Sequence, residues 1–285
     1  MHTSVLLKEA VGGLNVFPGG KYIDATYGVG GHAREIVAKG GNVLALDWDE
    51  ENVKVKNEEL SASQRIKNEK KIKLVWGNFA DIEKIAQEND FFPVDGILFD
   101  LGLSMEQIGG SGRGFSFKKL DEPLDMRISS STTKTAASII RSSNAEALYE
   151  ILSRNSQEID SGPISQAIFS AGRIRHMATV GDLVNVISSI QGLRNKKESV
   201  LRRLFQSLRI EVNDEMSNLE KGLEGALHVI KKGGVIAIIT FHETEDRLVK
   251  KIALKNNVTF TTKKPITSSS GLSFEESAKL RIISC

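Results

Sequence analysis

The first hundred residues alternate short apolar runs with longer stretches in which polar and apolar residues mix. Runs rich in β-forming residues predict strands at 22–26, 42–46 and 72–76, and the mixed stretches between them predict helices. A fourth run, at 94–101, is almost continuously apolar, as in a parallel strand that is covered on both faces. This βαβαβ rhythm favours an α/β fold with a parallel sheet.

From about residue 105 the pattern changes to Gly and Ser clusters followed by helical stretches, with no comparable apolar strand before residue 213. We therefore expect an inserted, mainly helical subdomain at 105–213. The main domain would then be formed by 1–104 and 214–285.

After the insert the pattern of the sheet returns. Residues 211–232 predict a helix that is closed by the glycines at 233–234. A fifth buried strand is predicted at 235–241, and another helix at about 245–254.

Two alternating runs near the end of the chain, at 258–262 and 278–284, are joined by a Ser/Gly-rich stretch. They predict an antiparallel hairpin at the edge of the sheet. Parallel strands that end in such a hairpin favour a Rossmann-like sheet.

The composition mainly excludes certain classes of protein and of site. The 285 residues are 40% apolar and carry a formal net charge of only +2, which does not by itself indicate nucleic acid. The single cysteine, Cys285, excludes a disulfide framework and a cysteine metal site, and we expect no metal. Residues 1–9 lack the features of a signal peptide, and no stretch is apolar enough to span a bilayer. We expect a cytoplasmic protein with no membrane partner, either a monomer or a homodimer.

A glycine-rich turn, Gly28-Val29-Gly30-Gly31-His32, follows the first predicted strand and leads into a helix. Such a turn lets a ligand approach the backbone closely, although it also closes ordinary βα units. Asp47 ends the second strand about 20 residues later, where a carboxylate can accept both ribose hydroxyls of an adenosine. The alternative for Asp47 is a simple cap at the strand end.

The third and fourth strands also end on candidate ligand contacts. Phe79 follows the third strand, and Asp100 ends the fourth. Four successive strand ends therefore offer glycine backbone, an acid, an aromatic ring and a second acid. Because parallel α/β sheets bind ligands beyond the carboxyl ends of their strands, these groups are expected to converge on one crevice.

An NAD-dependent oxidoreductase is the main competing interpretation, since residues 28–33 nearly satisfy the dinucleotide fingerprint. A dinucleotide needs a second mononucleotide half, however, whereas here the fourth strand leads directly into the helical insert. An adenosyl group with a short amino-acid tail needs only one half. The pattern thus favours S-adenosylmethionine in the sheet of a class I methyltransferase. A P-loop is excluded because no Gly-Lys-Ser/Thr element follows the glycines.

The insert has a charge signature of its own. Residues 111–210 contain 15 basic residues (10 Arg and 5 Lys) against 9 acidic ones, a net charge of +6, so the rest of the chain sums to −4. Phe115 and Phe117 lie beside Arg113 in a Gly/Ser-rich loop. Basic residues interleaved with aromatic ones suit RNA, and the alternative is a solvated basic surface with phenylalanines in a local core.

The motifs of the chain resemble those of the RsmH (MraW) family, methyltransferases that modify the N4 amine of a cytidine in the decoding region of small-subunit (16S) ribosomal RNA. The resemblance covers nearly the whole chain. Its most specific part is the run at 113–117, Arg-Gly-Phe-Ser-Phe, followed closely by Leu-Asp-Met-Arg at 124–127. The other matching stretches are 2–9, 24–32, 100–104, 205–210, 241–242 and 245–247.

The resemblance implies a set of cofactor contacts, namely Gly30, Gly31, His32, Asp47, Phe79, Asp100 and Gln107. Asp100 is also the candidate that orients the amine of the substrate, and His242 is a weaker candidate for accepting its proton, with a packing or capping role as the alternative. Ribosomal RNA or the small ribosomal subunit would be the partner. The candidates for RNA contact are Arg113, Phe115, Phe117, Arg127, Arg203 and Arg209.

The sequence departs from the family pattern in four places. The usual Ser-Ser-Pro-Gln is Ser-Met-Glu-Gln at 104–107, and Gly109 and Gly110 replace acidic residues. His-Glu-Thr-Glu-Asp stands at 242–246 in place of His-Ser-Leu-Glu-Asp. At 274–276, Phe-Glu-Glu replaces the arginines of the family, which puts negative charge near a possible RNA surface. A non-enzymatic alternative, an RNA-binding protein with a degenerate cofactor pocket, rests on this last change.

Overall fold

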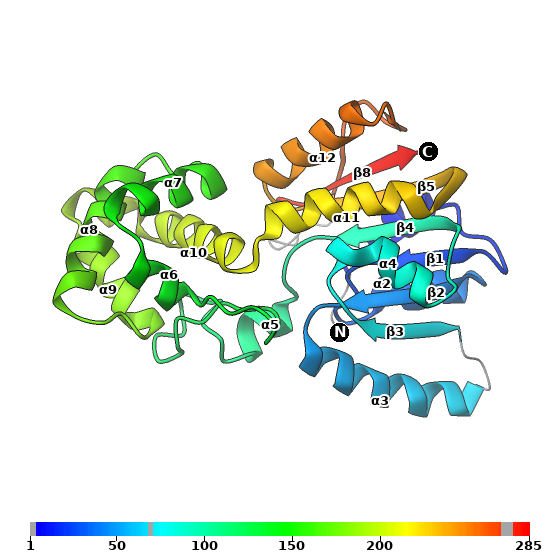
Figure 1. The fold of residues 1–285 in the computed structure, drawn as a ribbon, viewed down its shortest axis with the longest axis horizontal. Coiled ribbons are helices and arrows are strands. Elements are labelled where there is room, and N and C mark those ends of the chain that lie inside the picture. The colour runs from blue at the N-terminus through cyan, green and yellow to red at the C-terminus, as the bar shows by residue number, and fades with distance from the viewer. Residues whose placement is uncertain (1–3, 68–70, 269–275) are drawn as a thin grey trace. The chain divides into compact units, whose positions relative to one another are not determined.

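The computed structural model describes residues 4–67, 71–268 and 276–285. Phe274 and Glu275, which carry the departure in the tail, lie outside the described residues. The chain divides into two compact units, one formed by Met1–Gly102 with Met216–Cys285 and the other by Leu103–Glu215 (Figure 1). Each unit has a hydrophobic core of its own.

The first unit is built on one mixed sheet in the order β3-β2-β1-β4-β5-β8-β6, with β7 paired to β8. β1 to β5 are parallel, and β8 runs antiparallel between β5 and β6 (Figure 1). This arrangement confirms the Rossmann-like fold class and the antiparallel pairing near the C-terminus. The strands are β1 (Lys21–Asp24), β2 (Asn42–Asp47), β3 (Ile72–Trp76), β4 (Val94–Asp100), β5 (Ile230–Thr240), β6 (Thr259–Phe260), β7 (Ile266–Thr267) and β8 (Lys279–Ser284).

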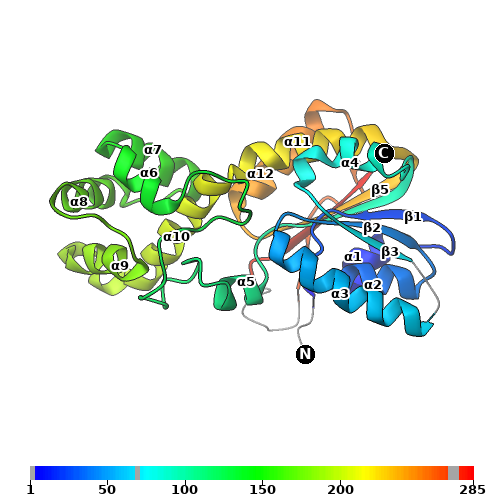
Figure 2. The same ribbon diagram turned by 60° about the horizontal axis from the view of Figure 1, so that its bottom comes forward.

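Helices cover both faces of this sheet, because side chains along its strands alternate between two cores. Ile23 belongs to a core with residues of α4, α11 and α12, whereas Tyr22 belongs to a core with residues of α1, α2 and α3 (Figure 2). The bounds are α1 (Leu7–Gly13), α2 (Gly31–Ala38), α3 (Glu50–Lys67), the 3-10 turn η1 (Phe79–Asp81), α4 (Ile82–Glu88), α11 (Glu215–Val229) and α12 (Glu243–Lys255).

The helix predicted at 211–232 is present as Glu215–Val229, and both of its predicted ends are wrong. Asp214 adopts a left-handed conformation (φ 49°) and separates two helices, and the second helix ends at Val229. The predicted helix end at 233–234 lies inside β5, because Ile230 pairs with Val94 and the Gly233 N–H donates to the carbonyl of Cys285. Pairing with distant strands thus overrides the local signal of two glycines.

The second unit is helical. Its one strand-like feature in the part of the chain described is an isolated bridge between Pro123 and Thr179. Side-chain caps explain several helix starts: Thr135, Asn144 and Thr179 each accept a backbone N–H of the following turn. The bounds are α5 (Met105–Gly110), α6 (Ala136–Ser142), α7 (Ala145–Ser156), α8 (Ser161–Ile174), α9 (Val180–Ser189), the 3-10 turn η2 (Gln191–Lys196) and α10 (Lys197–Asn213).

One buried amide fastens the long loop before α6 to the end of α10. The side chain of Asn213 donates to the carbonyl of Met126 (2.8 Å) and accepts the N–H of Ile128 (2.8 Å). It also donates to the carbonyl of Arg209, within its own helix. Since Asn213 is only 1% exposed, water cannot replace these bonds without opening the unit.

No helix in the ranges that the structure describes is long and apolar enough to cross a membrane.

We expect Asn213→Ala to destabilise the second unit by about 2–4 kcal/mol, because it leaves buried backbone groups of the loop without partners. Chemical denaturation monitored by circular dichroism would measure the loss. Asn185→Ala on the exposed side of α9 is the matched control and should change stability by less than about 0.5 kcal/mol. Equal effects of the two substitutions would contradict the fastening role.

Candidate functional site

Three acidic side chains end adjacent parallel strands of the first unit. Asp24 ends β1, Asp47 ends β2 and Asp100 ends β4, and the pairing of these strands brings all three to the same edge of the sheet (Figure 1). Parallel sheets bind ligands beyond this edge. The three carboxyl groups therefore mark the candidate site.

The glycine-rich turn lies between β1 and α2 at the same edge. Gly28 (φ +52°) and Gly30 (φ +77°) adopt left-handed conformations that disfavour side chains. A Cβ atom would meet nothing within 4 Å at Gly28, whereas at Gly31 it would lie 1.9 Å from Oγ of Ser4. The turn is thus open at Gly28 and closely packed at Gly31, which suits a ligand that approaches the backbone.

Asp47 holds this turn in place. Its Oδ2 accepts the N–H of Gly28 (3.0 Å) and the side-chain amide of Asn52 (2.6 Å), and Oδ1 accepts the N–H of Asp49 (2.9 Å). Burial raises the pKa of Asp47 to about 6. Asn52 also donates to the carbonyl of Gly28 (2.9 Å), a contact that sequence reasoning missed because a polar residue in the first turn of a helix is common.

Aromatic side chains stand at the end of β3. The ring of Phe79 packs edge-to-face on Phe99 (5.8 Å between centroids), and a Cβ atom at Gly222 of α11 would lie 2.8 Å from it. Trp76, which pairs in register with Asp47, is 48% exposed, and its Nε1–H donates to the carbonyl of Trp48. The two tryptophans of the chain therefore both lie next to Asp47, although sequence reasoning gave neither a role.

A buried histidine faces Asp100. Nε2 of His32 lies 3.1 Å from the carbonyl oxygen of Val5, and Nδ1 lies 3.6 Å from Oδ2 of Asp100. Because a carbonyl only accepts, Nε2 carries the hydrogen and Nδ1 presents a lone pair to Asp100. Burial lowers the pKa of His32 to about 4, so the ring is neutral. Burial and the negative charges of Asp24 and Glu245 raise the pKa of Asp100 well above its ordinary value.

Asp24 is the most enclosed of the three acids. It is fully buried, and its Oδ1 accepts the N–H of Thr26 (3.2 Å). Its Oδ2 accepts no hydrogen bond of standard geometry among the described residues, but the backbone N–H of Ala33 in α2 also acts on this carboxyl group and lowers its pKa. Burial, with the charge of Asp47 as a smaller contribution, raises the pKa of Asp24 to about 7. Sequence reasoning gave Asp24 no role, since the burial of an acid becomes visible only in three dimensions.

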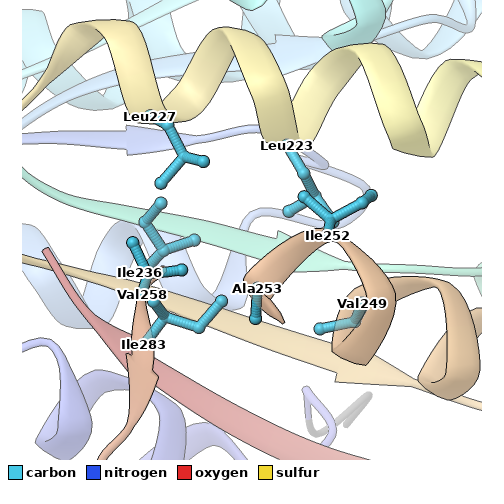
Figure 3. A pocket seen from close by; sticks show the side chains of 8 residues that line it. All are labelled: Leu223, Leu227, Ile236, Val249, Ile252, Ala253, Val258 and Ile283. Carbon is cyan, nitrogen blue, oxygen red and sulfur yellow. The ribbon is translucent and has the colours of Figure 1, made fainter. Parts of the chain in front are cut away.

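A small cavity elsewhere in this unit does not compete with the site. It lies between α11, α12 and the β5–β8 side of the sheet, and its lining side chains are all apolar (Figure 3). No polar group there could orient a cofactor. The lining residues are Leu223, Leu227, Ile236, Val249, Ile252, Ala253, Val258 and Ile283.

Comparison with known proteins identifies the family. Residues 1–284 match the model of the MraW methylase family. The chain belongs to the MraW methylase family. One relative, ribosomal RNA small subunit methyltransferase H of Bacteroides thetaiotaomicron, is 37% identical over 260 residues, which are 90% of this chain and 82% of the relative. The protein of the same name from Symbiobacterium thermophilum is 38% identical over 255 residues, or 88% of this chain and 78% of the relative.

Among solved structures, an rRNA methylase from Streptococcus thermophilus aligns over 100% of this chain and 98% of its own, with 11% identity and a TM-score of 0.46. That likeness is too distant to bear on function. Membership of the MraW family by itself overturns the oxidoreductase alternative and makes S-adenosylmethionine the cofactor. The open turn at Gly28 and the buried carboxyl group of Asp24 fit this cofactor, since the turn lets a ligand approach the backbone and a carboxyl group can ionise beside a positively charged ligand.

Two residues that the MraW resemblance implicates act as helix caps. Gln107 lies in the second unit, where its side chain accepts the N–H of Ser104 and its N–H donates to that residue's Oγ. His242 begins α12: its Nδ1 accepts the N–H of Glu245 (3.3 Å). Its Nε2 lies 3.0 Å from Oε1 of Glu245 but outside hydrogen-bonding geometry. Capping explains both positions without a ligand, and their roles toward cofactor or substrate stay predictions.

The three candidate arginines for RNA contact outside the 113–117 run are paired with acids within the second unit. Arg127 binds Asp125 through two nitrogens. Arg209 does the same with Glu215 in a partly buried pair. Arg203 contacts the fully buried carboxylate of Glu158 at 2.5 Å.

The remaining candidates are held in the same unit. Arg113 donates from Nη1 to the carbonyls of Arg127 and Ile128. Phe115 is buried in the core, and Phe117 packs edge-to-face on Phe205. These contacts favour structural roles, and RNA contact by the six candidates stays a prediction. The unit also exposes basic side chains outside these six candidates: Lys118, Arg141, Arg173, Arg175, Lys197 and Arg202.

The buried acid gives a pH-dependent prediction. Below pH 7 the folded protein keeps Asp24 protonated, whereas the unfolded chain ionises it above about 3.8, so stability falls as pH rises between these values. Asp24→Asn removes this loss. We expect the variant to match the wild type near pH 4 and to be more stable by about 4 kcal/mol at pH 8, as urea denaturation at a series of pH values would measure.

Asp95→Asn is the control for that series. Asp95 lies at the other end of β4, where it accepts the N–H of Lys21 and pairs with Lys231. Its substitution should give no stability gain that grows with pH. A gain of equal size in both variants, or none in Asp24→Asn, would contradict the assignment of the buried charge to Asp24.

Proposed function

We propose that the protein transfers the methyl group of S-adenosylmethionine to the N4 amine of a cytidine in the decoding region of small-subunit (16S) ribosomal RNA. The observation that carries the proposal is the open glycine turn beside Asp47 and Asp100 in a member of the MraW family. The names of the relatives, which are ribosomal RNA small subunit methyltransferases, support ribosomal RNA as the substrate.

The cofactor would be held by the residues at the strand ends. We assign the backbone of Gly30, Gly31 and His32 to its amino-acid part, Asp47 to the ribose and Phe79 to the adenine. Bound S-adenosylmethionine supplies an electrophilic methyl group on a positively charged sulfur. The protein's task is then to align the amine with that methyl and to exclude water, for which no metal is required.

Asp100 is the residue proposed to act on the amine. The lone pair of an exocyclic amine is delocalised into the ring, and an acceptor for its N–H groups helps to localise that pair as the new bond forms. The carboxylate of Asp100, or the backbone carbonyl beside it, can accept such a bond. Asp100 lies at the end of β4 with 22% of its side chain exposed, so it is accessible from the site.

We propose the Leu103–Glu215 unit as the RNA-recognition subdomain. Arginine and lysine side chains bind phosphates, and a base that is to be methylated must be splayed out of its stack. The net charge of +6 over 111–210 supports this assignment. Of the exposed basic side chains named above, Arg175 pairs with Asp182 and Arg202 pairs with Glu198. Lys118, Arg141, Arg173 and Lys197 form no ion pair with the described residues, so they are better placed for phosphates than the paired arginines.

A helix-capping role predicts a small kinetic effect at His242. We expect His242→Ala to lower kcat by less than tenfold, because a cap stabilises α12 but carries no proton in the reaction. Single-turnover methylation of the RNA substrate would measure the rate. His242→Asn, which keeps a capping side chain, is the control and should restore the stability of α12. A loss above a hundredfold in both variants would make His242 the general base.

The proposed function is tested by methylation of small ribosomal subunits, and of protein-free 16S RNA, with isotopically labelled S-adenosylmethionine. We expect label in N4-methylcytidine from one nucleotide of the decoding region. Asp47→Ala should abolish both cofactor binding in calorimetry and incorporation, because Asp47 would bind the ribose and holds Gly28. Asp95→Ala, at the far end of β4, should leave both intact.

Two results would overturn the proposal. Label in another base, or in a carbon-bound methyl group, would replace the substrate assignment. Absence of S-adenosylmethionine binding by the wild type, with binding of ribosomal RNA retained, would favour the RNA-binding protein with a degenerate pocket.

A further inference from the structure

The turn between α8 and α9 exposes a short segment that mixes basic and apolar side chains. Residues 172–176, Gly-Arg-Ile-Arg-His, end α8 and lead toward α9, and all five are exposed (Figure 1). We call this segment the α8–α9 corner. Ile174, at its centre, is 86% exposed. Apolar surface therefore lies directly beside arginine side chains.

The α8–α9 corner is held by the residues on either side of it. The N–H of Arg175 donates to the carbonyl of Ala171 (3.1 Å), which closes α8. Met177, directly after the corner, is 2% exposed and belongs to the core of the second unit. Because both sides are anchored, the exposure of Ile174 belongs to the folded unit and does not come from a frayed helix end.

Arg173 is the cation of the corner that no acid neutralises in the part of the chain that the structure describes. Its guanidinium lies over the ring of Phe169 (5.8 Å to the centroid), and the N–H groups at the edge of its plane stay available for a phosphate. Arg175 instead pairs with Asp182 of α9 (3.2 Å). The uncompensated positive charge of the corner is therefore on the residue next to Ile174.

The other end of α8 has similar exposure with the opposite charge. Ile159, just before that helix, is 94% exposed, and its sequence neighbours are Glu158 and Asp160. An exposed isoleucine alone needs no explanation, since single apolar side chains are common on protein surfaces. What distinguishes Ile174 is its charged surroundings, which attract a polyanion, whereas those of Ile159 do not.

We propose that the α8–α9 corner is a docking surface for the ribosomal RNA substrate, with Arg173 on a phosphate and Ile174 against the ribose or base of the adjoining nucleotide. The exposed ring of His176 adds a surface on which a base can stack. This inference rests on the proposed function, and it names the part of the second unit that holds the RNA. Cations for the backbone and apolar or aromatic side chains for unstacked nucleotides are the groups that single-stranded RNA requires.

The test is equilibrium binding of the full chain to protein-free 16S RNA and to small ribosomal subunits at a series of KCl concentrations. We expect Arg173→Gln to bind both probes about fivefold or more weakly, and to lower the magnitude of the slope of log K against log salt concentration by about one, because one phosphate contact fewer releases about one counterion fewer. Arg202→Gln is the matched control, since it removes an exposed arginine of the same unit that is paired with Glu198. It should change the slope by less than about 0.5 and the affinity by less than about twofold.

Ile174→Ser tests the apolar contact. The substitution removes apolar surface but no charge, so we expect binding about three- to tenfold weaker with an unchanged salt slope. Ile159→Ser, at the other end of α8, is the matched control and should bind as the wild type does. In methylation assays Ile174→Ser should raise KM for the RNA about threefold or more and leave kcat within about twofold, because the corner binds substrate but contacts no reacting atom.

The outcomes distinguish this inference from the proposed function. Equal effects of Ile174→Ser and Ile159→Ser, or of Arg173→Gln and Arg202→Gln, would overturn the inference and leave the methyltransferase intact. An effect on small subunits alone would also overturn it, because the corner would then contact a ribosomal protein. If the wild type forms no N4-methylcytidine while the expected losses of RNA binding are found, the proposed function fails and the corner remains an RNA-binding surface. Calorimetric binding of S-adenosylmethionine, unchanged in each variant, shows that the variants are folded.

Discussion

The hydrogen bond from the Gly28 N–H to Asp47 is the contact on which the rest of the site depends. It joins the turn after β1 to the end of β2, and Asn52 repeats the connection from the first turns of α3. With the turn fixed, α2 begins at Gly31, and its buried His32 is brought against Asp100 at the end of β4. Three neighbouring strand ends are thereby tied into one arrangement.

Asp47 would have two roles, one in holding the glycine turn and one in binding the ribose of the cofactor. Each oxygen of a carboxylate can accept more than one hydrogen bond, so Asp47 can hold the turn and still accept from a ribose. A ligand role and a structural role therefore coincide at one residue, and loss of binding in a variant of Asp47 does not by itself separate them.

The central strands could be predicted because they are apolar on both faces. β2 and β4 were predicted within one residue, since a covered parallel strand reads as a short continuous run. β3 lies at the edge of the sheet with Lys73 and Trp76 exposed, and it was predicted with its observed bounds from its β-forming residues alone. The boundary between α11 and β5 could not be predicted in the same way. Helix-ending glycines and strand glycines look alike in sequence, and only pairing with Val94 and Cys285 decides between them.

Only part of the candidate site could be predicted from the sequence. Asp47, Asp100 and the glycine turn follow from where strands end, which a sequence reveals. The contact between Val5 and His32 does not, because it joins segments 27 positions apart through a backbone carbonyl. In the helical unit, arginines that composition assigns to RNA are paired with acids such as Glu158 and Glu215, which are distant in sequence or belong to another helix.

Buried acids without a cationic partner, at the edge of the sheet where a ligand would bind, make the folded protein less stable but can serve ligand binding. An acid whose pKa is raised by desolvation makes the folded state less stable at neutral pH, and a protein that only had to fold would gain by replacing it with an amide. The lost stability of the folded state is regained only when a positively charged ligand occupies the site. An edge of the sheet that is lined by Asp24, Asp47 and Asp100 therefore suits a ligand that carries positive charge. S-adenosylmethionine carries positive charge on both its sulfonium and its ammonium group, so its binding can offset the free energy that burial of these acids costs.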